Sequence, residues 1–153
     1  MGSDSPIVEM EGVGLRYNSG AEVLSDISLR LSEGDFCFLT GASGAGKTSL
    51  LNMMHLSRRP TRGKVRLFGR DVDYIRHDGL ASVRRRIGVV FQDYRLLNHL
   101  TALDNVALPL RIIGKSEKYI RTHVPELLEW VGLKNCMNAR PDTLSGGQQQ
   151  RIA

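Results

Sequence analysis

The residues most suited to chemistry form a glycine-rich loop, Gly41-Ala-Ser-Gly-Ala-Gly-Lys-Thr48, with the pattern G-x-x-x-x-G-K-[ST]. The loop lies between an apolar run and a stretch with helical spacing of apolar residues. Glycines let backbone N–H groups turn inward around phosphates, and the helix start adds the positive end of its dipole. Lys47 would neutralise the β- and γ-phosphates, and Thr48 would ligate Mg²⁺. The alternative to a phosphate-binding loop is an ordinary glycine-rich turn. The candidate nucleotide-binding residues of this loop are Gly41, Ala42, Ser43, Gly44, Ala45, Gly46, Lys47, Thr48 and Ser49.

A second glycine-rich motif, Leu144-Ser-Gly-Gly-Gln148, follows the loop much later in the chain. Its glycines would open a helix whose N-terminus directs backbone donors at an anion. A loop of this composition without function is the alternative. The candidate anion contacts are Ser145, Gly146, Gly147 and Gln148.

A third candidate is the end of the apolar run Val89-Val-Phe-Gln-Asp93. Asp93 would be the acidic Mg²⁺ ligand if the chain were a generic phosphate-loop enzyme. We favour Gln92 as the functional residue, because a helical piece that ends in the second motif follows it. A polar strand end without function is the remaining alternative.

The elements that must position these residues begin with strands. Loose alternation predicts a strand over 7–17, a turn at 18–20 and a strand with one wet face over 27–31. The apolar runs 35–40 and 87–91 predict strands buried on both faces, with Cys37 as a core residue. A shorter strand is expected over 64–68 and a short helix or turn over 80–86. The helix after the loop is expected to run toward Pro60–Gly63 and to turn Leu50, Leu51 and Met54 inward.

Helices dominate the rest of the chain. Thr101 is expected to cap a helix that starts at Ala102, with Asp104 completing the capping arrangement. A further helix is predicted over 117–131, with a bend or restart near Pro125 because an interior proline removes a backbone hydrogen bond. The fold class is therefore α/β: a core over about residues 7–92 and a helical subdomain over about residues 93–148.

Composition sets broad limits. The 153 residues carry a net charge of +5 and are 41% apolar, which is typical of a globular domain with a real core. No apolar run reaches the length of a membrane span, and the start of the chain shows no secretory signal, so we expect a cytosolic chain. Cys37 and Cys136 form no C-x-x-C pair and are expected to be structurally silent.

The basic clusters at 58–59 and 84–86 are interpreted as solvated helix ends. Acidic lipid headgroups or a membrane subunit would suit them better than nucleic acid, because aromatic residues do not interleave with them.

The two glycine motifs, in this order, resemble those of the ATP-binding subunits of ABC transporters. That resemblance implies a core sheet with an N-terminal antiparallel β subdomain, with ATP and Mg²⁺ as cofactors. It implies that Tyr17 stacks on adenine, that Gln92 contacts the Mg²⁺ or the attacking water, and that Ser145 and Gly147 contact the γ-phosphate held by a second subunit. A head-to-tail homodimer with two nucleotides between the subunits follows from the same resemblance.

Within that family the chain is most similar to cell-division ATP-binding subunits of the FtsE type. This implies a transmembrane partner of the FtsX type and a place on the inner face of the plasma membrane. The alternative is the ATPase subunit of a lipoprotein-releasing or macrolide-type exporter. A phosphate-loop kinase would have no reason to contain the second motif, and no helix-turn-helix or RNA-binding signature indicates nucleic acid. The segments that carry the similarity are 51–56, 59–63, 90–97, 104–110 and 144–151.

The resemblance also implies motifs that this sequence does not contain. Members of the family continue after the second glycine motif with the Walker B Asp, the catalytic Glu and a switch His. We therefore expect a C-terminally incomplete ATPase domain that hydrolyses ATP negligibly by itself, since general base catalysis contributes about 10²–10⁴-fold. Open sheet edges predict poor solubility for such a chain.

Overall fold

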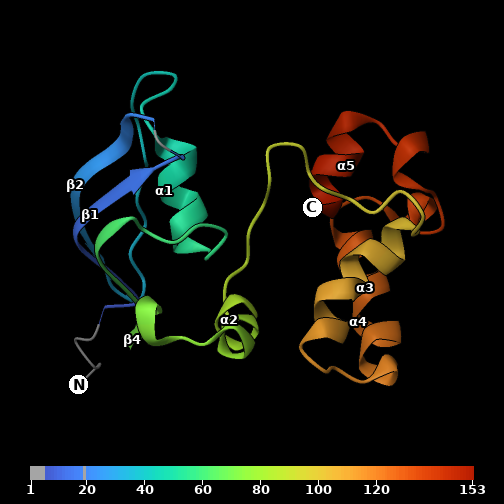
Figure 1. The fold of residues 1–153 in the computed structure, drawn as a ribbon. Coiled ribbons are helices and arrows are strands. Elements are labelled where there is room, and N and C mark those ends of the chain that lie inside the picture. The colour runs from blue at the N-terminus through green and yellow to red at the C-terminus, as the bar shows by residue number, and fades with distance from the viewer. Residues whose placement is uncertain (1–5, 19) are drawn as a thin grey trace. The chain divides into compact units, whose positions relative to one another are not determined.

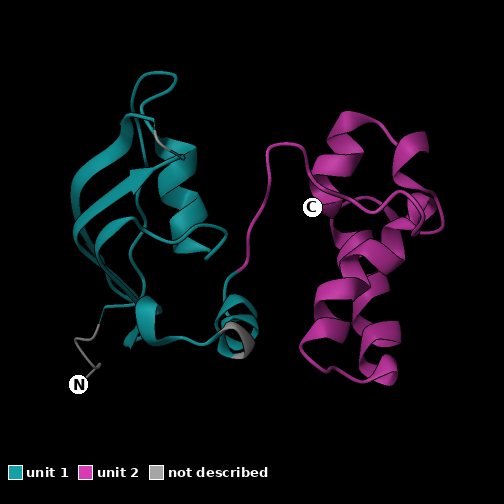
Figure 2. Ribbon diagram, viewed as in Figure 1, with its two compact units in different colours: residues 1–87 teal, residues 88–153 magenta. Residues whose placement is uncertain are grey.

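The computed structural model describes residues 6–18 and 20–153, except for the side chains of residues 77 and 78. The chain divides into two compact units, residues 1–87 and residues 88–153 (Figure 2). The start of the chain and Ser19 of the expected turn lie outside the described residues.

The first unit is built on an antiparallel sheet with the strand order β2-β1-β3-β4. Strand β1 (Val8–Arg16) pairs with β2 (Glu22–Leu31) on one side and with β3 (Arg62–Leu67) on the other. The short β4 (Arg70–Asp71) closes a tight turn after β3. The expected N-terminal antiparallel subdomain is thus present, and β2 is longer than the alternation over 27–31 indicated.

The core of the first unit lies between this sheet and helix α1 (Lys47–Met54), which Figure 1 shows beside it. Alternate residues of the strands point inward because side chains of a strand alternate between its faces. From α1, Leu50 and Met53 are buried, whereas Leu51 is 50% exposed. The prediction that Leu51 points into the core was therefore wrong. The buried strand residues are Met10, Val13, Leu15, Leu24, Val65 and Leu67.

A short helical stretch completes the first unit. The 3₁₀ turn η1 (Val72–Tyr74) follows β4, and helix α2 (His77–Arg84) begins three residues before the helix expected from sequence. Val72, Leu80 and Val83 join the core, whereas Tyr74 is 86% exposed.

The two expected buried strands are absent. Residues 35–40 and 87–91 have no strand pairing, and Phe36 and Phe38 are each 83% exposed in an edge-to-face pair with ring centroids 5.1 Å apart. Cys37 is likewise exposed, so its assignment to the core was wrong. An apolar run becomes a buried strand only where neighbouring strands pair with it and helices cover it. Within residues 6–18 and 20–153 no strand pairs with either run.

The second unit is helical. Helices α3 (Ala102–Ile112) and α4 (Glu117–Trp130) lie side by side, and α5 (Gly146–Ile152) packs on the same core (Figure 1). The 3₁₀ turns η2 (Lys134–Cys136) and η3 (Pro141–Thr143) connect α4 to α5. The buried residues of this core are Ala102, Ala107, Ile120, Val124, Leu128, Leu133, Leu144 and Ile152.

Each of the two long helices begins after a residue whose side chain caps its N-terminus. Thr101 caps α3 as expected, and Ser116 caps α4. Helix α4 runs without interruption through Pro125, so the expected restart was wrong. Burial of Val124 and Leu128 on either side of the proline holds the helix together despite the missing N–H. Trp130 ends α4 with 85% of its surface exposed. No helix in the described part of the chain has the length and apolar character needed to cross a bilayer.

Candidate nucleotide-binding site

The glycine loop takes its shape from left-handed backbone positions that favour glycine. Gly44 has φ 80° and Gly46 has φ 88°, and Gly46 is the N-cap of α1. A Cβ on Gly46 would lie 2.6 Å from Leu24 Cδ2 and 3.1 Å from the carbonyl oxygen of Val23. Gly46 is thus fixed twice, by its dihedral angle and by its close approach to β2.

Lys47 is the first residue of α1, and its side chain folds back across the loop. Its Nζ donates to the carbonyl oxygens of Gly41, at 2.8 Å, and Ala42, at 2.7 Å. The ammonium therefore lies against the start of the loop, with Gly44 and Thr48 exposed nearby in sequence. Glycines with room for a ligand, a fixed ammonium and a helix N-terminus are the donor set that suits a polyphosphate.

Tyr17 is tied directly to the helix that follows the loop. Its hydroxyl lies 3.0 Å from the hydroxyl of Ser49, which is buried in the second position after Lys47. The guanidinium carbon of Arg58 lies 5.2 Å from the centroid of the Tyr17 ring. The face of the Tyr17 ring thus accepts a planar group, the guanidinium of Arg58, and a stacked base is a planar group of the same kind.

Gln92 lies in a turn and is exposed. The turn is closed by the N–H of Tyr94, which donates to the carbonyl of Phe91, and the Arg95 guanidinium lies 4.0 Å from the centroid of the Phe91 ring. The side chain of Gln92 has no hydrogen bond to any residue that the structure describes. It is therefore available to a ligand.

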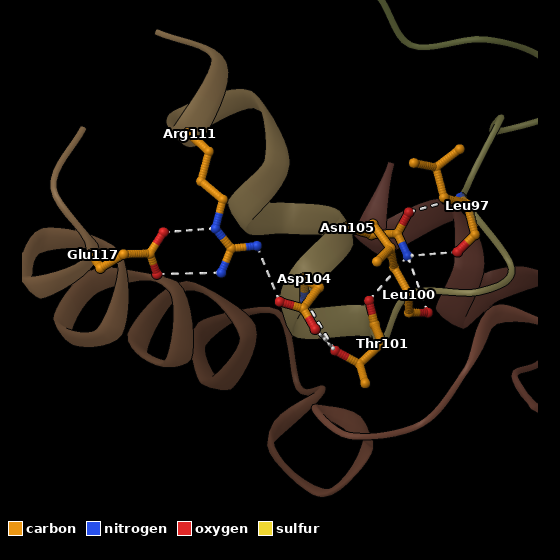
Figure 3. A network of polar contacts seen from close by, with 7 residues as sticks. All are labelled: Leu97, Leu100, Thr101, Asp104, Asn105, Arg111 and Glu117. Atoms are coloured by element: carbon orange, nitrogen blue, oxygen red, sulfur yellow. Dashed lines mark hydrogen bonds and ion pairs between the residues drawn. The ribbon is translucent and has the colours of Figure 1, made fainter. Parts of the chain in front are cut away.

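The segment that follows Gln92 is anchored by a single amide side chain, that of Asn105 in the first turn of α3 (Figure 3). Its Oδ1 accepts from the N–H of Leu97 at 2.8 Å. Its Nδ2 donates to the carbonyls of Leu97, Leu100 and Thr101, at 3.2, 3.4 and 2.9 Å. Asn105 therefore fixes the loop between Gln92 and α3.

A second polar chain, also shown in Figure 3, joins α3 to α4. The Arg111 guanidinium donates to Asp104 at 3.1 Å and to Glu117 at 2.8 Å. Asp104 in turn accepts from the Thr101 hydroxyl at 2.8 Å. The Thr101 hydrogen bond and then Arg111 lower the pKa of Asp104, and Arg111 lowers the pKa of Glu117.

The Ser-Gly-Gly-Gln motif forms the start of α5. Ser145 is the N-cap, and Gln148 completes a capping box: its Oε1 accepts from the Ser145 N–H at 2.8 Å, and the Ser145 hydroxyl accepts from the Gln148 N–H at 3.3 Å. A Cβ on Gly146 or Gly147 would meet no atom within 4 Å. The glycine face of α5 is thus open, while the glutamine side chain is turned back into the cap.

Gln148 also makes a contact that sequence reasoning missed. Its Nε2 lies 3.4 Å from Sγ of Cys136, so the expectation that Cys136 is structurally silent was wrong. Gln149 Nε2 donates to the carbonyls of Pro141 and Leu144, at 2.8 and 3.1 Å. The S-x-x-Q spacing of a capping box could have shown the role of Gln148 in advance, whereas nothing in the sequence indicates its contact with Cys136.

The structure therefore groups the candidate residues in two sets. Tyr17, the glycine loop and Lys47 to Ser49 belong to the first unit, and Gln92 and Ser145 to Gln148 belong to the second. Among the described residues, no cluster of three or more His, Cys, Asp or Glu side chains could hold a metal ion.

Comparison with known proteins identifies the family. A model of the ABC transporter family matches residues 24–153. The chain belongs to this family. Among the curated relatives is the cell division ATP-binding protein FtsE of Bacillus subtilis (strain 168), 40% identical over 96% of this chain and 64% of the relative. The chain thus spans about two-thirds of the length of that relative.

Other relatives of similar identity have different names. The methionine import ATP-binding protein MetN of Cupriavidus metallidurans is 40% identical over 95% of this chain and 43% of its own length. The macrolide export ATP-binding/permease protein MacB of Salmonella choleraesuis is 42% identical over 96% of this chain and 23% of its own length.

A solved structure gives the expected fold independently. It is described as the dimeric structure of a post-hydrolysis state of an ATP-binding cassette bound to ADP and Pi. Its similarity to this chain has a TM-score of 0.86 at 35% identity, over 95% of this chain and 66% of that one. The fold class expected from sequence, that of an ABC ATPase cassette, is confirmed.

Proposed function

We propose that this chain is the nucleotide-binding part of an FtsE-type ATPase subunit, which couples ATP binding and hydrolysis to a membrane partner in cell division. One observation carries the proposal: Lys47 spans a glycine loop in a chain that also holds an open, capped Ser-Gly-Gly helix start. The FtsE relative supports the specific role.

In this proposal, the loop residues Gly41 to Lys47 bind the phosphates of ATP. Backbone N–H groups and the Lys47 ammonium supply the donors, and breaking the two Lys47 bonds to loop carbonyls frees the ammonium for the β- and γ-oxygens. Thr48 and Gln92 would ligate Mg²⁺, which neutralises the charge on the phosphates when bound. The Tyr17 ring would stack on the base, held in place by its hydrogen bond to Ser49.

A second copy of the chain would complete the site. Ser145 and Gly147 would face the γ-phosphate held by the other subunit, because the glycine face of α5 is open and the Gln148 side chain keeps the serine in the cap. The dimeric state of the cassette bound to ADP and Pi supports this arrangement.

Binding of a fluorescent ATP analogue with Mg²⁺ tests the loop. Lys47→Ala should weaken binding by about 10- to 100-fold, since hydrogen bonds to charged groups contribute about 1.5–3 kcal/mol. Lys118→Ala, an exposed lysine of α4, is the control and should bind as the parent chain does. Equal affinity in the Lys47→Ala and Lys118→Ala chains would contradict the proposed site.

Sedimentation with and without Mg-ATP tests the second subunit. Ser145→Ala should lower ATP-dependent self-association and leave binding of the fluorescent analogue to the monomer unchanged. An analogue affinity that falls with Ser145→Ala in a monomeric sample would place the serine in the same subunit's site instead.

The membrane partner is proposed to be of the FtsX type, with the subunit at the inner face of the plasma membrane. The second candidate function is an exporter or importer ATPase, which the MacB and MetN relatives favour at nearly the same identity. Co-purification from membranes with an FtsX-type or a solute-transporting subunit distinguishes the two.

A further inference from the structure

The first unit holds a hollow of about 550 Å³ that shares no residue with the glycine loop. It lies where β4, η1 and the start of α2 meet, the region between the β4 and α2 labels of Figure 1. The residues that line it are Arg70, Asp71, Tyr74, Ile75, Arg76 and Gly79.

Arginines from separate stretches of the chain gather around this hollow. Arg70 and Arg76 line it, and Arg59, from the loop after α1, donates its Nη2 to the carbonyl of Ile75 at 2.9 Å. All three guanidinium groups belong to exposed residues. Arg59 uses one N–H in that contact, which leaves its other donors available.

A fourth arginine lies at the turn that leads into the hollow. The guanidinium carbon of Arg86 lies 3.8 Å from the centroid of the Phe68 ring, two residues before Arg70. A guanidinium stacked on a ring keeps its in-plane N–H groups free for an anion. Positive charge around the hollow thus comes from Arg59 after α1, from Arg70 in β4 and from Arg76 before α2, and Arg86 adds charge at the neighbouring Phe68.

The charge of this part of the chain is strongly one-sided. Residues 58–86 contain ten arginines and lysines but only three acidic residues, all of them aspartates. The whole chain has 21 arginines and lysines and 16 aspartates and glutamates. Asp71, the acid that lines the hollow, already accepts from the N–H of Asp73 at 3.0 Å. No described residue offers a side-chain partner to Arg70 or Arg76, the side chains of residues 77 and 78 being outside the description.

The chemistry of the hollow suits a phosphate-rich surface better than a small soluble anion. All of its arginines are solvated, so there is no desolvated cage to hold one free phosphate tightly. Tyr74, 86% exposed, and the half-buried Ile75 add apolar surface among the arginines. An amphipathic ring among arginines is the combination that lies at the headgroup level of a membrane.

We propose that this arginine hollow binds directly to the surface of a bilayer that contains anionic phospholipids, with Tyr74 inserted among the headgroups. The contact does not depend on the nucleotide site, and its partner is the lipid itself. Each arginine near such a surface contributes about fivefold to binding.

Sedimentation of the chain with vesicles tests the proposal. We expect binding to vesicles of phosphatidylcholine with phosphatidylglycerol and none to phosphatidylcholine alone. The variant Arg70→Gln/Arg76→Gln should bind about 25-fold more weakly. Neither arginine side chain makes a hydrogen bond to a described residue, so the change leaves the backbone contacts of both positions in place. An unchanged melting curve confirms that the variant is folded.

The matched control is Lys118→Gln/Arg121→Gln, which removes the same charge from exposed residues of α4. It should bind within about twofold of the parent chain, and so should Arg70→Lys/Arg76→Lys, because lipid attraction depends on charge rather than on a guanidinium fork. Raising the salt from about 0.1 M to about 1 M shortens the screening length from about 10 Å to about 3 Å and should weaken binding of the parent chain. Tyr74→Ala should weaken binding at both salt concentrations, since ring insertion is not screened.

Three results would overturn the proposal. The first is an absence of binding to anionic vesicles. The second is a loss with the α4 control as large as that with Arg70→Gln/Arg76→Gln, which would show that only net charge matters. The third is binding of polyglutamate, in place of vesicles, that is lost in the Arg70→Gln/Arg76→Gln variant, which would assign the hollow to an acidic polypeptide.

Discussion

The two units position their candidate ligand-binding residues in different ways. In the first unit the backbone does it: Gly46 adopts φ 88° and packs against Leu24, and Lys47 bonds to loop carbonyls. In the second unit side chains do it: Gln148 holds Ser145 in its cap, and Asn105 fixes the loop after Gln92. A site shaped by backbone tolerates almost no added atom, whereas a site shaped by side-chain hydrogen bonds should lose stability in small, separable steps.

The largest effect is expected at Gly46. Gly46→Ala should lower the free energy of unfolding of the first unit by about 2–4 kcal/mol, because left-handed strain and a close contact with Leu24 add together. Gly44→Ala is the matched control, since φ is 80° but a Cβ there would meet nothing within 4 Å, and it should lose only about 1 kcal/mol. Hydrogen exchange measured separately over residues 6–87 and 88–153 reads the result. Equal losses of stability in Gly46→Ala and Gly44→Ala would show that the contact with Leu24 does not add to the backbone strain.

The next effect is expected at Asn105. Asn105→Ala removes four hydrogen bonds to three residues and should destabilise the second unit by about 2 kcal/mol. Exchange should rise first at the N–H of Leu97. Asn98→Ala, an exposed asparagine of the same loop, should change nothing. A slower exchange at Leu97 in Asn105→Ala would contradict the anchoring role.

A smaller effect is expected at the start of α5. Gln148→Ala should lower stability by about 1 kcal/mol through loss of the capping box, and Gln150→Ala, an exposed neighbour, should be neutral. Cys136→Ala should produce part of the Gln148→Ala loss, and the two changes should not add fully, because both remove the same contact. Full additivity in a double-mutant cycle would show that the thiol does not hold the glutamine.

The smallest effect concerns pH. The pKa of Asp104 is lowered in the folded protein, so its contribution is present above the unfolded pKa, about 3.9, and is lost as the pH falls through the folded pKa. Asp104 is more than a third solvated with its partner, so the contribution is about 0.5 kcal/mol. Denaturant unfolding between about pH 5 and pH 2 should show a shallower loss for Asp104→Asn than for the parent chain. Asp142→Asn, an exposed control, should follow the parent curve.

Local signals in the sequence predict the starts of the long helices of the second unit. The cap at Thr101 and the span of α4 follow from hydrogen bonds and spacing within a few residues, which is information that the sequence carries. One exception within these helices, the uninterrupted course of α4 at Pro125, depends on packing of Val124 and Leu128 that spacing alone does not reveal.

The remaining errors, in the first unit and in the run 87–91 where the second unit begins, depend on distant parts of the molecule. The runs 35–40 and 87–91 are apolar enough for buried strands, but pairing decides whether a strand forms, and Phe36 and Phe38 remain in solvent. In α1, the spacing admits two neighbouring faces, and docking on the sheet selects Leu50 with Met53 over Leu51. For the candidate site, the motifs predicted which residues to consider, whereas the contacts of Tyr17 with Ser49 and of Gln148 with Cys136 required the fold.

Trp130 is the only tryptophan of the sequence, and the end of α4 leaves it 85% exposed to water in the folded protein. Indole emission reports the polarity around the ring, so its wavelength should barely move when the second unit melts, and the first unit has no indole to observe. Tryptophan fluorescence would therefore change little when the structure of either unit is lost. Tyr17, whose hydroxyl is engaged by Ser49, gives the first unit an optical signal that changes when that bond breaks.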